Sequence, residues 1–479
     1  MVIESIFSYS AFIIYICIFV LIYLFVKKII SKYGFNGLSI FVLTFSIFYF
    51  LVPFIQTFFK SYRDNTSLFT ILLNRMSDSE IFFNFLISSI CLLIIITSYH
   101  IRFKSTGNIE FKEAYKRSLI DNNLLYKRVK LITNTIFLVG ILSIVLLIIE
   151  VGSLKNYLAL GSMTRGLDKS PTEYINSSYL QLITLSVVIL IPPYLYLFLY
   201  RMKKDKIMIF MFFISLFFAV LYLLYNQGRA PLIIFFLPFF FVIGKIKKRG
   251  MFGLVLLFGL GLFLLSYLDA IFQYLAYGYY EIEQSENYIS QFLKEFSYPF
   301  ANFSLRYELI DFSGFRYMYD YVIWPFTMIP SSLLSLFGLS KEAITSVSTF
   351  NTEAYGAFLG VNTTGGIPVD FLTFNFYQFG YISLLPMCFV IGRLLRMLDK
   401  VFYFFKGNIA ITILLYRISF SMIGILNNSD LSAIMRNRLD VVLLLVIIIY
   451  IYMLEKKRLR IKELNNSKFI GNMERRNYN

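Results

Sequence analysis

Long apolar stretches recur along this chain and are separated by short clusters of Lys and Arg. A bilayer core about 30 Å thick needs roughly 20 apolar residues per helix, and many of the stretches reach this length. The chain is 58% hydrophobic, whereas soluble domains are typically about 45–50% apolar. The pattern predicts an all-α, polytopic integral membrane protein.

We predict eleven transmembrane helices, eight within residues 1–271 and three within residues 371–454. The first is expected to be a retained helix and not a cleaved signal peptide, because no basic segment or small-residue cleavage site accompanies it. The predicted spans cover residues 8–26, 35–59, 80–99, 131–150, 178–200, 207–225, 231–244, 251–271, 371–392, 407–426 and 440–454.

The basic residues are concentrated after every second apolar stretch, which indicates the orientation of the chain. Basic loops resist translocation, so the rich clusters mark the cytoplasmic side. An odd number of spans then places the N-terminus outside and the basic tail, residues 455–479, in the cytoplasm. The net charge of +17 is therefore attributed to loops that face anionic lipid, and no nucleic-acid partner is expected. The clusters lie at residues 27–32, 102–130, 201–206, 245–249, 393–406 and 456–476.

Residues 272–370 form one predicted outer loop of about a hundred residues, and a loop this long usually has a function or its own structure. It carries ten Asp and Glu against four Lys and Arg, unlike the basic remainder of the chain. Apolar residues at helical spacing between Ile289 and Phe303 predict amphipathic helix, which Pro299 should kink or break. Trp324 and the apolar residues after it predict a segment that lies at the membrane interface.

Several function classes lose support from residues that the sequence lacks. There is no P-loop, no HExxH and no DxD pair, which argues against an ATP-driven pump, a zinc protease and a metal-dependent sugar-nucleotide transferase. The single histidine, His100, falls at the cytoplasmic end of a predicted span. Cys17, Cys91 and Cys388 fall inside apolar spans and imply no disulfide framework.

Arginines on the predicted outer side are the remaining chemical signals. Arg229 lies in a short turn between two apolar spans beside Gly228, and Arg165 lies in another glycine-flanked turn. Arg306 and Arg316 lie among aromatics in the large loop. The planar guanidinium suits phosphate because it donates paired hydrogen bonds and keeps its charge.

Each arginine also has an ordinary structural interpretation. Arg229 could extend to lipid headgroups, and Arg165 could be a solvated loop charge. The two loop arginines could form salt bridges with the acids nearby, which are Glu308, Asp311 and Asp320. Arg417, inside a predicted span, is expected to form a structural pair within the bundle, because an unpaired charge there is expensive. Arg436 and Arg438 are expected to be plain loop charges.

Three stretches together resemble Wzy-type polymerases of bacterial surface polysaccharides, the O-antigen and oligosaccharide repeat-unit polymerase group. The segment GGIPVD at 365–370, followed by Phe374–Gly380, resembles the end of that family's large outer loop. Residues 314–317 with 329–333 resemble its loop pattern, and Gly228-Arg229 resembles its short arginine-bearing turn. Ser331 stands where many members carry Arg.

The resemblance implies a membrane glycosyltransferase at the outer face of the bacterial inner membrane. Its substrates would be undecaprenyl-pyrophosphate-linked oligosaccharides, with membrane lipid around it and a chain-length regulator protein as a candidate partner. No cofactor or metal is expected, because the pyrophosphate leaving group is already activated. The expected pyrophosphate contacts are Arg229 and Arg316, then Arg306 and Arg165; the expected general base is Asp370, with Glu353 or Asp311 as alternatives.

Three other functions stay open at this point. O-antigen ligases have a similar architecture but use a histidine in the large loop, which is absent here. A lipid-linked oligosaccharide flippase would be expected to have more even loops and more charges within its spans. A membrane protein whose loop only binds a partner is the third alternative.

Overall fold

The computed structural model describes most of the chain, and every regular element in the described part is a helix. The all-α class is therefore confirmed. The predicted span at 251–271 and Arg165 lie outside the described residues. The described residues are 2–59, 68–101, 123–163, 176, 179–226, 229–243, 274, 288–327, 329, 331–336, 338, 344–361, 366–405 and 409–476.

Seven helices in the described part are long and apolar enough to cross a membrane. Two shorter apolar helices, Pro231–Phe241 and Ile411–Asn427, coincide with further predicted spans. The membrane class is thereby supported, and the total of eleven spans stays a prediction. The seven are Tyr9–Lys32, Gly37–Phe58, Asp78–His100, Asn123–Glu150, Gln181–Lys203, Lys206–Asn226 and Tyr381–Phe404.

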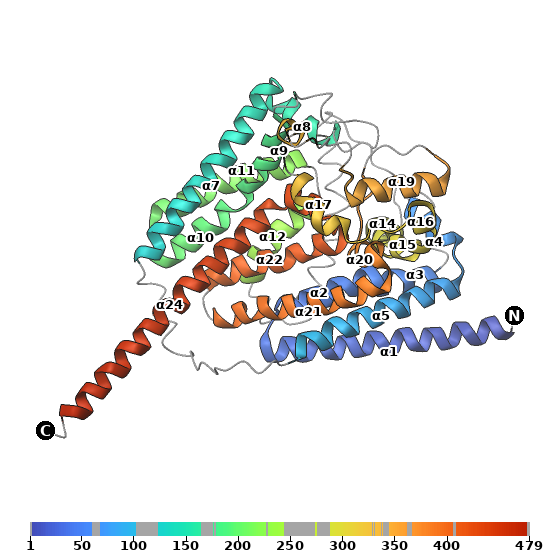
Figure 1. Ribbon diagram of the computed structural model, residues 1–479, viewed down its shortest axis with the longest axis horizontal. Coiled ribbons are helices and arrows are strands. Elements are labelled where there is room, and N and C mark those ends of the chain that lie inside the picture. The colour runs from blue at the N-terminus through green and yellow to red at the C-terminus, as the bar shows by residue number, and fades with distance from the viewer. Residues whose placement is uncertain are drawn as a thin grey trace.

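The helices up to residue 243 form two groups, with the orange and red helices α21, α22 and α24 between them, and Figure 1 shows the helices of the two groups in blue (α1 to α5) and in green (α7 to α12). In chain order they are α1 (Val2–Tyr33), α2 (Gly37–Ser46), η1 (Ile47–Leu51), α3 (Val52–Phe58), α4 (Leu68–Arg75), α5 (Asp78–His100), α7 (Asn123–Glu150), α8 (Leu154–Met163), α9 (Leu180–Ser186), η5 (Val187–Leu190), α10 (Pro192–Lys203), α11 (Lys206–Asn226) and α12 (Arg229–Ile243).

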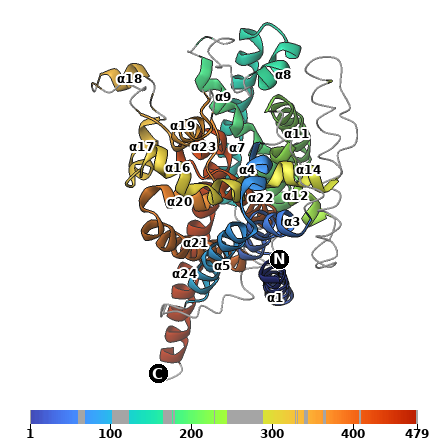
Figure 2. The same cartoon turned by 90° about the vertical axis from the view of Figure 1, so that its right-hand side faces the viewer.

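The helices after residue 287 include the described part of the large loop. Figure 1 shows α14, α15, α16 and α19 gathered at the end of the bundle where the N-terminus lies, while α24 projects from the opposite end. Figure 2 shows α18 standing away from the body beside α17. These helices are α14 (Tyr288–Phe296), α15 (Tyr298–Ser304), α16 (Arg306–Ser313), α17 (Tyr319–Thr327), α18 (Ser331–Ser335), α19 (Val347–Leu359), α20 (Phe371–Phe379), α21 (Tyr381–Phe404), α22 (Ile409–Asn427), α23 (Leu431–Asn437) and α24 (Leu439–Arg476).

Prolines explain where several helices change or end. Pro53 lacks an N–H, and the turn before it, η1, is a π-helix that continues α2 into α3. The predicted break at Pro299 is confirmed, because α14 ends at Phe296 and α15 begins with Tyr298.

The single span predicted over residues 371–392 is wrong in its bounds. Gly380 has φ +61°, a backbone conformation that side chains with a Cβ rarely adopt, and it separates α20 from α21. The long apolar helix therefore begins at Tyr381 and continues to Phe404, while α20 is a short buried helix that belongs with the loop. This break makes Tyr381 the first residue of the long helix α21.

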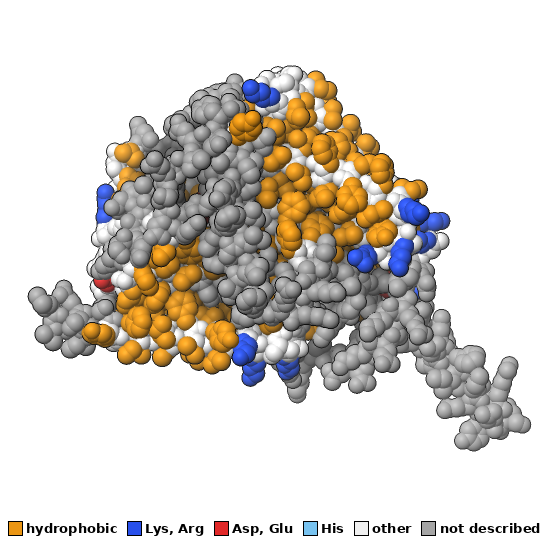
Figure 3. All heavy atoms as spheres, turned by 180° about the vertical axis from the view of Figure 1, so that it is seen from behind, with side chains coloured by type: hydrophobic (Ala, Val, Ile, Leu, Met, Phe, Trp, Pro, Cys, Tyr) orange, Lys and Arg blue, Asp and Glu red, His pale blue; other side chains and the backbone are white. Residues whose placement is uncertain are grey.

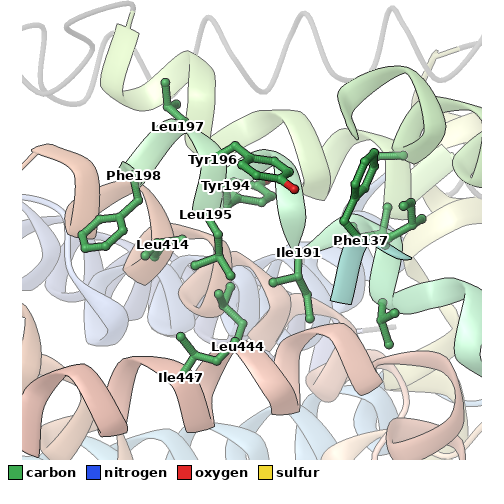
Figure 4. Close-up of a cluster of buried hydrophobic side chains, with 14 of the residues drawn as sticks. Phe137, Ile191, Tyr194, Leu195, Tyr196, Leu197, Phe198, Leu414, Leu444 and Ile447 are labelled. Carbon is green, nitrogen blue, oxygen red and sulfur yellow. The ribbon is translucent and has the colours of Figure 1, made fainter. Parts of the chain in front are cut away.

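Two large hydrophobic cores hold the bundle together. One core is formed by α7, the helices from α9 through α12, α22 and α24. Figure 4 shows its centre, where Leu195 lies among Leu414, Leu444 and Ile447. The other joins α1, α2, α3 and α5 to α15, α20 and α21. The outer surface is also apolar, and Figure 3 shows a broad hydrophobic face with Lys and Arg near its margins. A surface this apolar fits contact with lipid.

Candidate functional site

Arg316 is occupied by a salt bridge within the loop, as its ordinary interpretation predicted. Its Nε donates to Asp320 Oδ2 at 3.0 Å, and Nη2 donates to the other carboxylate oxygen of Asp320 and to the Thr345 carbonyl at 2.8 Å. Asp320 also accepts from Gln378 Nε2 at 2.8 Å. Arg316 therefore joins the start of α17 to α20, and its charge is already neutralised.

Arg306 is the more deeply buried of the two loop arginines, and its side chain has no measurable exposure to solvent. Nη1 donates to Asn84 Oδ1 and to the Phe303 carbonyl, both at 2.7 Å, and Nη2 donates to the Tyr381 hydroxyl at 2.9 Å. Nε is buried without a hydrogen-bond partner. Within the described ranges no carboxylate forms a salt bridge with Arg306, so the predicted pairing with Glu308 or Asp311 is not observed.

Aromatic rings surround the Arg306 guanidinium. Its central carbon lies 4.3 Å from the ring centre of Phe303, 4.5 Å from Tyr307, 5.2 Å from Phe376 and 5.9 Å from Tyr381. Such rings attract a cation through their negative faces and exclude water. They do not cancel the positive charge, so the site keeps its capacity to attract an anion.

The Arg306 site is assembled from five helices that belong to three separate parts of the sequence. Asn84 comes from α5, Phe303 from the end of α15, Arg306 from the start of α16, Phe376 from α20 and Tyr381 from the start of α21. Tyr307 is half exposed, and its hydroxyl lies 2.9 Å from the Tyr381 hydroxyl. The two tyrosines thus connect the buried guanidinium to the surface of the protein.

Asp370, the expected general base, is completely buried as the N-cap of α20. Oδ1 accepts from the Tyr49 hydroxyl and from the backbone N–H groups of Leu372 and Thr373, and Oδ2 accepts from Asn302 Nδ2 at 2.9 Å. Burial raises the pKa of the Asp370 carboxyl above its ordinary value, although hydrogen bonds from Thr373, Tyr49 and Asn302 oppose the rise. This geometry supports a capping role, since no face of the carboxylate is open to a substrate.

The other expected site residues are not brought together with Arg306. Glu353 on α19 and Asp311 on α16 are both exposed. Arg229 is the first residue of α12, and its side chain is outside the described part. The residues described therefore assign one of the four predicted pyrophosphate arginines, Arg306, to a buried and unneutralised position.

A second buried cation lies deeper in the bundle. Arg417 on α22 forms a salt bridge with Asp440 on α24, and both side chains are almost completely buried. The expectation of a structural pair for Arg417 is thus confirmed. Arg438 was expected to be a plain loop charge, but it lies against Gly424 of α22 and interacts electrostatically with both members of the pair. Sequence reasoning missed this third member, because only the packing of α24 on α22 brings it near Arg417.

In the described part, no group of three or more His, Cys, Asp or Glu side chains is placed to hold a metal ion. Comparisons with protein-family models, curated proteins and solved structures returned no match.

Proposed function

We propose that this protein is a polysaccharide repeat-unit polymerase of the bacterial inner membrane. It would transfer a growing glycan from undecaprenyl pyrophosphate to the next lipid-linked repeat unit at the outer face of the membrane. The observation that carries the proposal is Arg306, a buried guanidinium with no carboxylate partner in the described residues, on a loop helix at one end of a membrane bundle.

The proposed reaction exchanges one bond at the anomeric carbon for another. The bond from that carbon to a pyrophosphate oxygen breaks, and a bond to a hydroxyl oxygen of the acceptor sugar forms. The acceptor proton passes to a base, and the bonding electrons leave with the pyrophosphate. Negative charge therefore develops on the leaving group, where a fixed guanidinium lowers the barrier most.

The surroundings of Arg306 suit this role. Three of its N–H donors are already held by Asn84, Phe303 and Tyr381, so the guanidinium is oriented before a ligand arrives. The aromatic rings lower the local dielectric constant, which strengthens the attraction between a cation and a phosphate oxygen. In this proposal the half-exposed Tyr307 ring moves aside, and the pyrophosphate takes the place of the ring against the Arg306 guanidinium.

The absence of a carboxylate partner for Arg306 among the described residues supports polymerase chemistry better than the alternative of a loop that only binds a partner. A loop with a purely structural role would be expected to neutralise a buried cation, as Arg316 is neutralised by Asp320. A buried cation that lacks such a partner is costly, and the cost is understandable where an anionic substrate supplies the missing charge.

The test is a glycan profile of a deletion strain together with mass analysis of its lipid-linked intermediates. Single repeat units on the final acceptor, with no long ladder, are expected if the protein is a polymerase. Long lipid-linked polymer that never reaches its acceptor would show a ligase instead. Single units trapped on the cytoplasmic face would show a flippase, and either of these results would overturn the proposal.

A further inference from the structure

The salt bridge between Arg417 and Asp440 lies well inside the bundle. Arg417 precedes the last residue of α22, Asn427, by ten residues, which corresponds to about 15 Å along the helix axis. At that end of α22, Ser429 N donates to the Val369 carbonyl of the loop at 2.7 Å. The short helix α23 then leads the chain back along α22, so that α24 begins beside Gly424 and Arg417.

This arrangement leaves charges and hydrogen-bonding groups unmatched. Arg417 Nη1 and Asp440 Oδ1 are both buried without a hydrogen-bond partner. Arg438 lies close to the same pair, and its guanidinium has no hydrogen bond to the described residues. Around Arg438 the electrostatic neighbours in the described part are Asp440, Arg417 and Tyr222, so two guanidinium groups face a single carboxylate.

The excess positive charge of Arg417 and Arg438 lies in apolar surroundings, where an unbalanced charge is costly. The Arg417 guanidinium lies 5.9 Å from the ring centre of Tyr194 and 5.7 Å from that of Phe235, in one of the two hydrophobic cores. Charged residues inside a membrane bundle are costly and usually mark a binding site or a pathway. A buried polar atom without a partner is uncommon in native proteins, and a bound ion is one way to satisfy it.

We propose that Arg417 and Arg438 form a second anion site, separate from Arg306, which binds a phosphate-type anion. The anion contacts Arg417 through its free Nη1 and Arg438 through its guanidinium, while Asp440 holds Arg417 in place. Arg438 is partly exposed, so it provides the side from which the anion arrives. The phosphate belongs either to a free anion or to the headgroup of a lipid. This inference does not depend on the proposed polymerase function.

The experiment uses the purified full-length protein in nanodiscs of phosphatidylcholine, which carries no net charge. Thermal unfolding is followed by circular dichroism with inorganic phosphate, inorganic pyrophosphate or dodecyl phosphate, each compared with chloride at equal ionic strength. We expect at least one phosphate to raise the unfolding midpoint of the wild type. Arg438→Gln should weaken its apparent affinity at least about tenfold, because a charge-assisted hydrogen bond is lost.

Matched controls separate this site from others. Arg436→Gln removes a neighbouring but exposed arginine and should leave the affinity unchanged. A response to inorganic phosphate identifies a free anion, whereas a response to dodecyl phosphate alone identifies a lipid headgroup. If Arg438→Gln does not fold, Arg438→Lys keeps the charge and should still weaken binding. A midpoint that no phosphate raises, or that rises equally in the Arg438 variants, would overturn the inference.

Discussion

The hydroxyl group of Tyr307 lies 2.9 Å from that of Tyr381, and the Tyr381 hydroxyl accepts a hydrogen bond of 2.9 Å from Arg306. A half-exposed residue of the loop is thereby linked to a completely buried cation through one tyrosine. In the proposed function, movement of the Tyr307 ring opens this site to the substrate.

Removal of the Tyr381 hydroxyl should destabilise the protein more than removal of the Tyr307 hydroxyl. Tyr381→Phe removes the acceptor of Arg306 Nη2 and leaves a buried charged donor unpaired, which should cost about 1–3 kcal/mol. Tyr307→Phe removes a hydroxyl that is near solvent and should cost less than about 1 kcal/mol. Thermal unfolding of the purified variants measures the difference. Equal midpoints for the two variants would contradict the contacts described for Arg306.

The Asp370 carboxyl should make the folded protein less stable as the pH rises. Its pKa is raised in the folded protein by burial, so the protonated form is favoured there relative to the unfolded chain. The resulting stabilisation is fully present below the unfolded pKa of about 4 and is lost as pH rises through the folded pKa. Asp370→Asn removes this titration.

The unfolding midpoint of the wild type minus that of Asp370→Asn should therefore decrease as the pH is raised stepwise from about 4, in buffers about one unit apart. Titrations elsewhere in the protein affect both variants equally and cancel in the difference. A difference that grew with pH would show that the Asp370 pKa is lowered and would contradict the described environment.

Gly392 should not tolerate a side chain, because it lies where α21 packs against α5. A Cβ at Gly392 would overlap Ser98 Oγ and the Ile95 carbonyl oxygen. Gly392→Ala should destabilise the bundle by about 1–3 kcal/mol, although alanine favours helix more than glycine does. Gly366→Ala is the matched control, since the nearest atom to its Cβ is 4.0 Å away. Similar unfolding midpoints for the two variants would refute the packing of α21 on α5.

Arg229 stays a predicted phosphate contact at the first residue of α12. Arg229→Lys should reduce polymer formation although it keeps the charge, because lysine lacks the planar fork that donates paired hydrogen bonds. The length and amount of polymer in a deletion strain complemented with this variant are the readout. Wild-type polymer would remove Arg229 from the site.

Much of the fold followed from hydrophobic periodicity, whereas the site depended on packing. The break at Pro299 was predictable because proline ends helices locally. The separation of α20 from α21 at Gly380 was not, because an apolar run hides a single residue with positive φ. Asp370 precedes a helix and could have been recognised as an N-cap, but its complete burial could not.

The arginines also show that the sequence predicts local contacts but not those made by tertiary packing. The salt bridge of Arg316 with Asp320 joins residues four apart, and nearby acids in the sequence indicated it. The neighbours of Arg306 are Asn84 and Tyr381, which lie 222 and 75 residues away. Arg438 meets Arg417 only because α23 leads the chain back into the bundle. Contacts of this kind come from tertiary packing and leave no local pattern.

The central claim is that Arg306 binds the pyrophosphate of a lipid-linked glycan. The most direct measurement compares surface polymer and lipid-linked intermediates in a deletion strain complemented with wild type, Arg306→Lys or Arg436→Lys. Membrane levels of each protein are measured in parallel, so that loss of folding is recognised. We predict that Arg306→Lys reduces long polymer about a hundredfold and accumulates single lipid-linked repeat units, while Arg436→Lys matches wild type. A normal polymer ladder from Arg306→Lys at wild-type protein levels would contradict the claim.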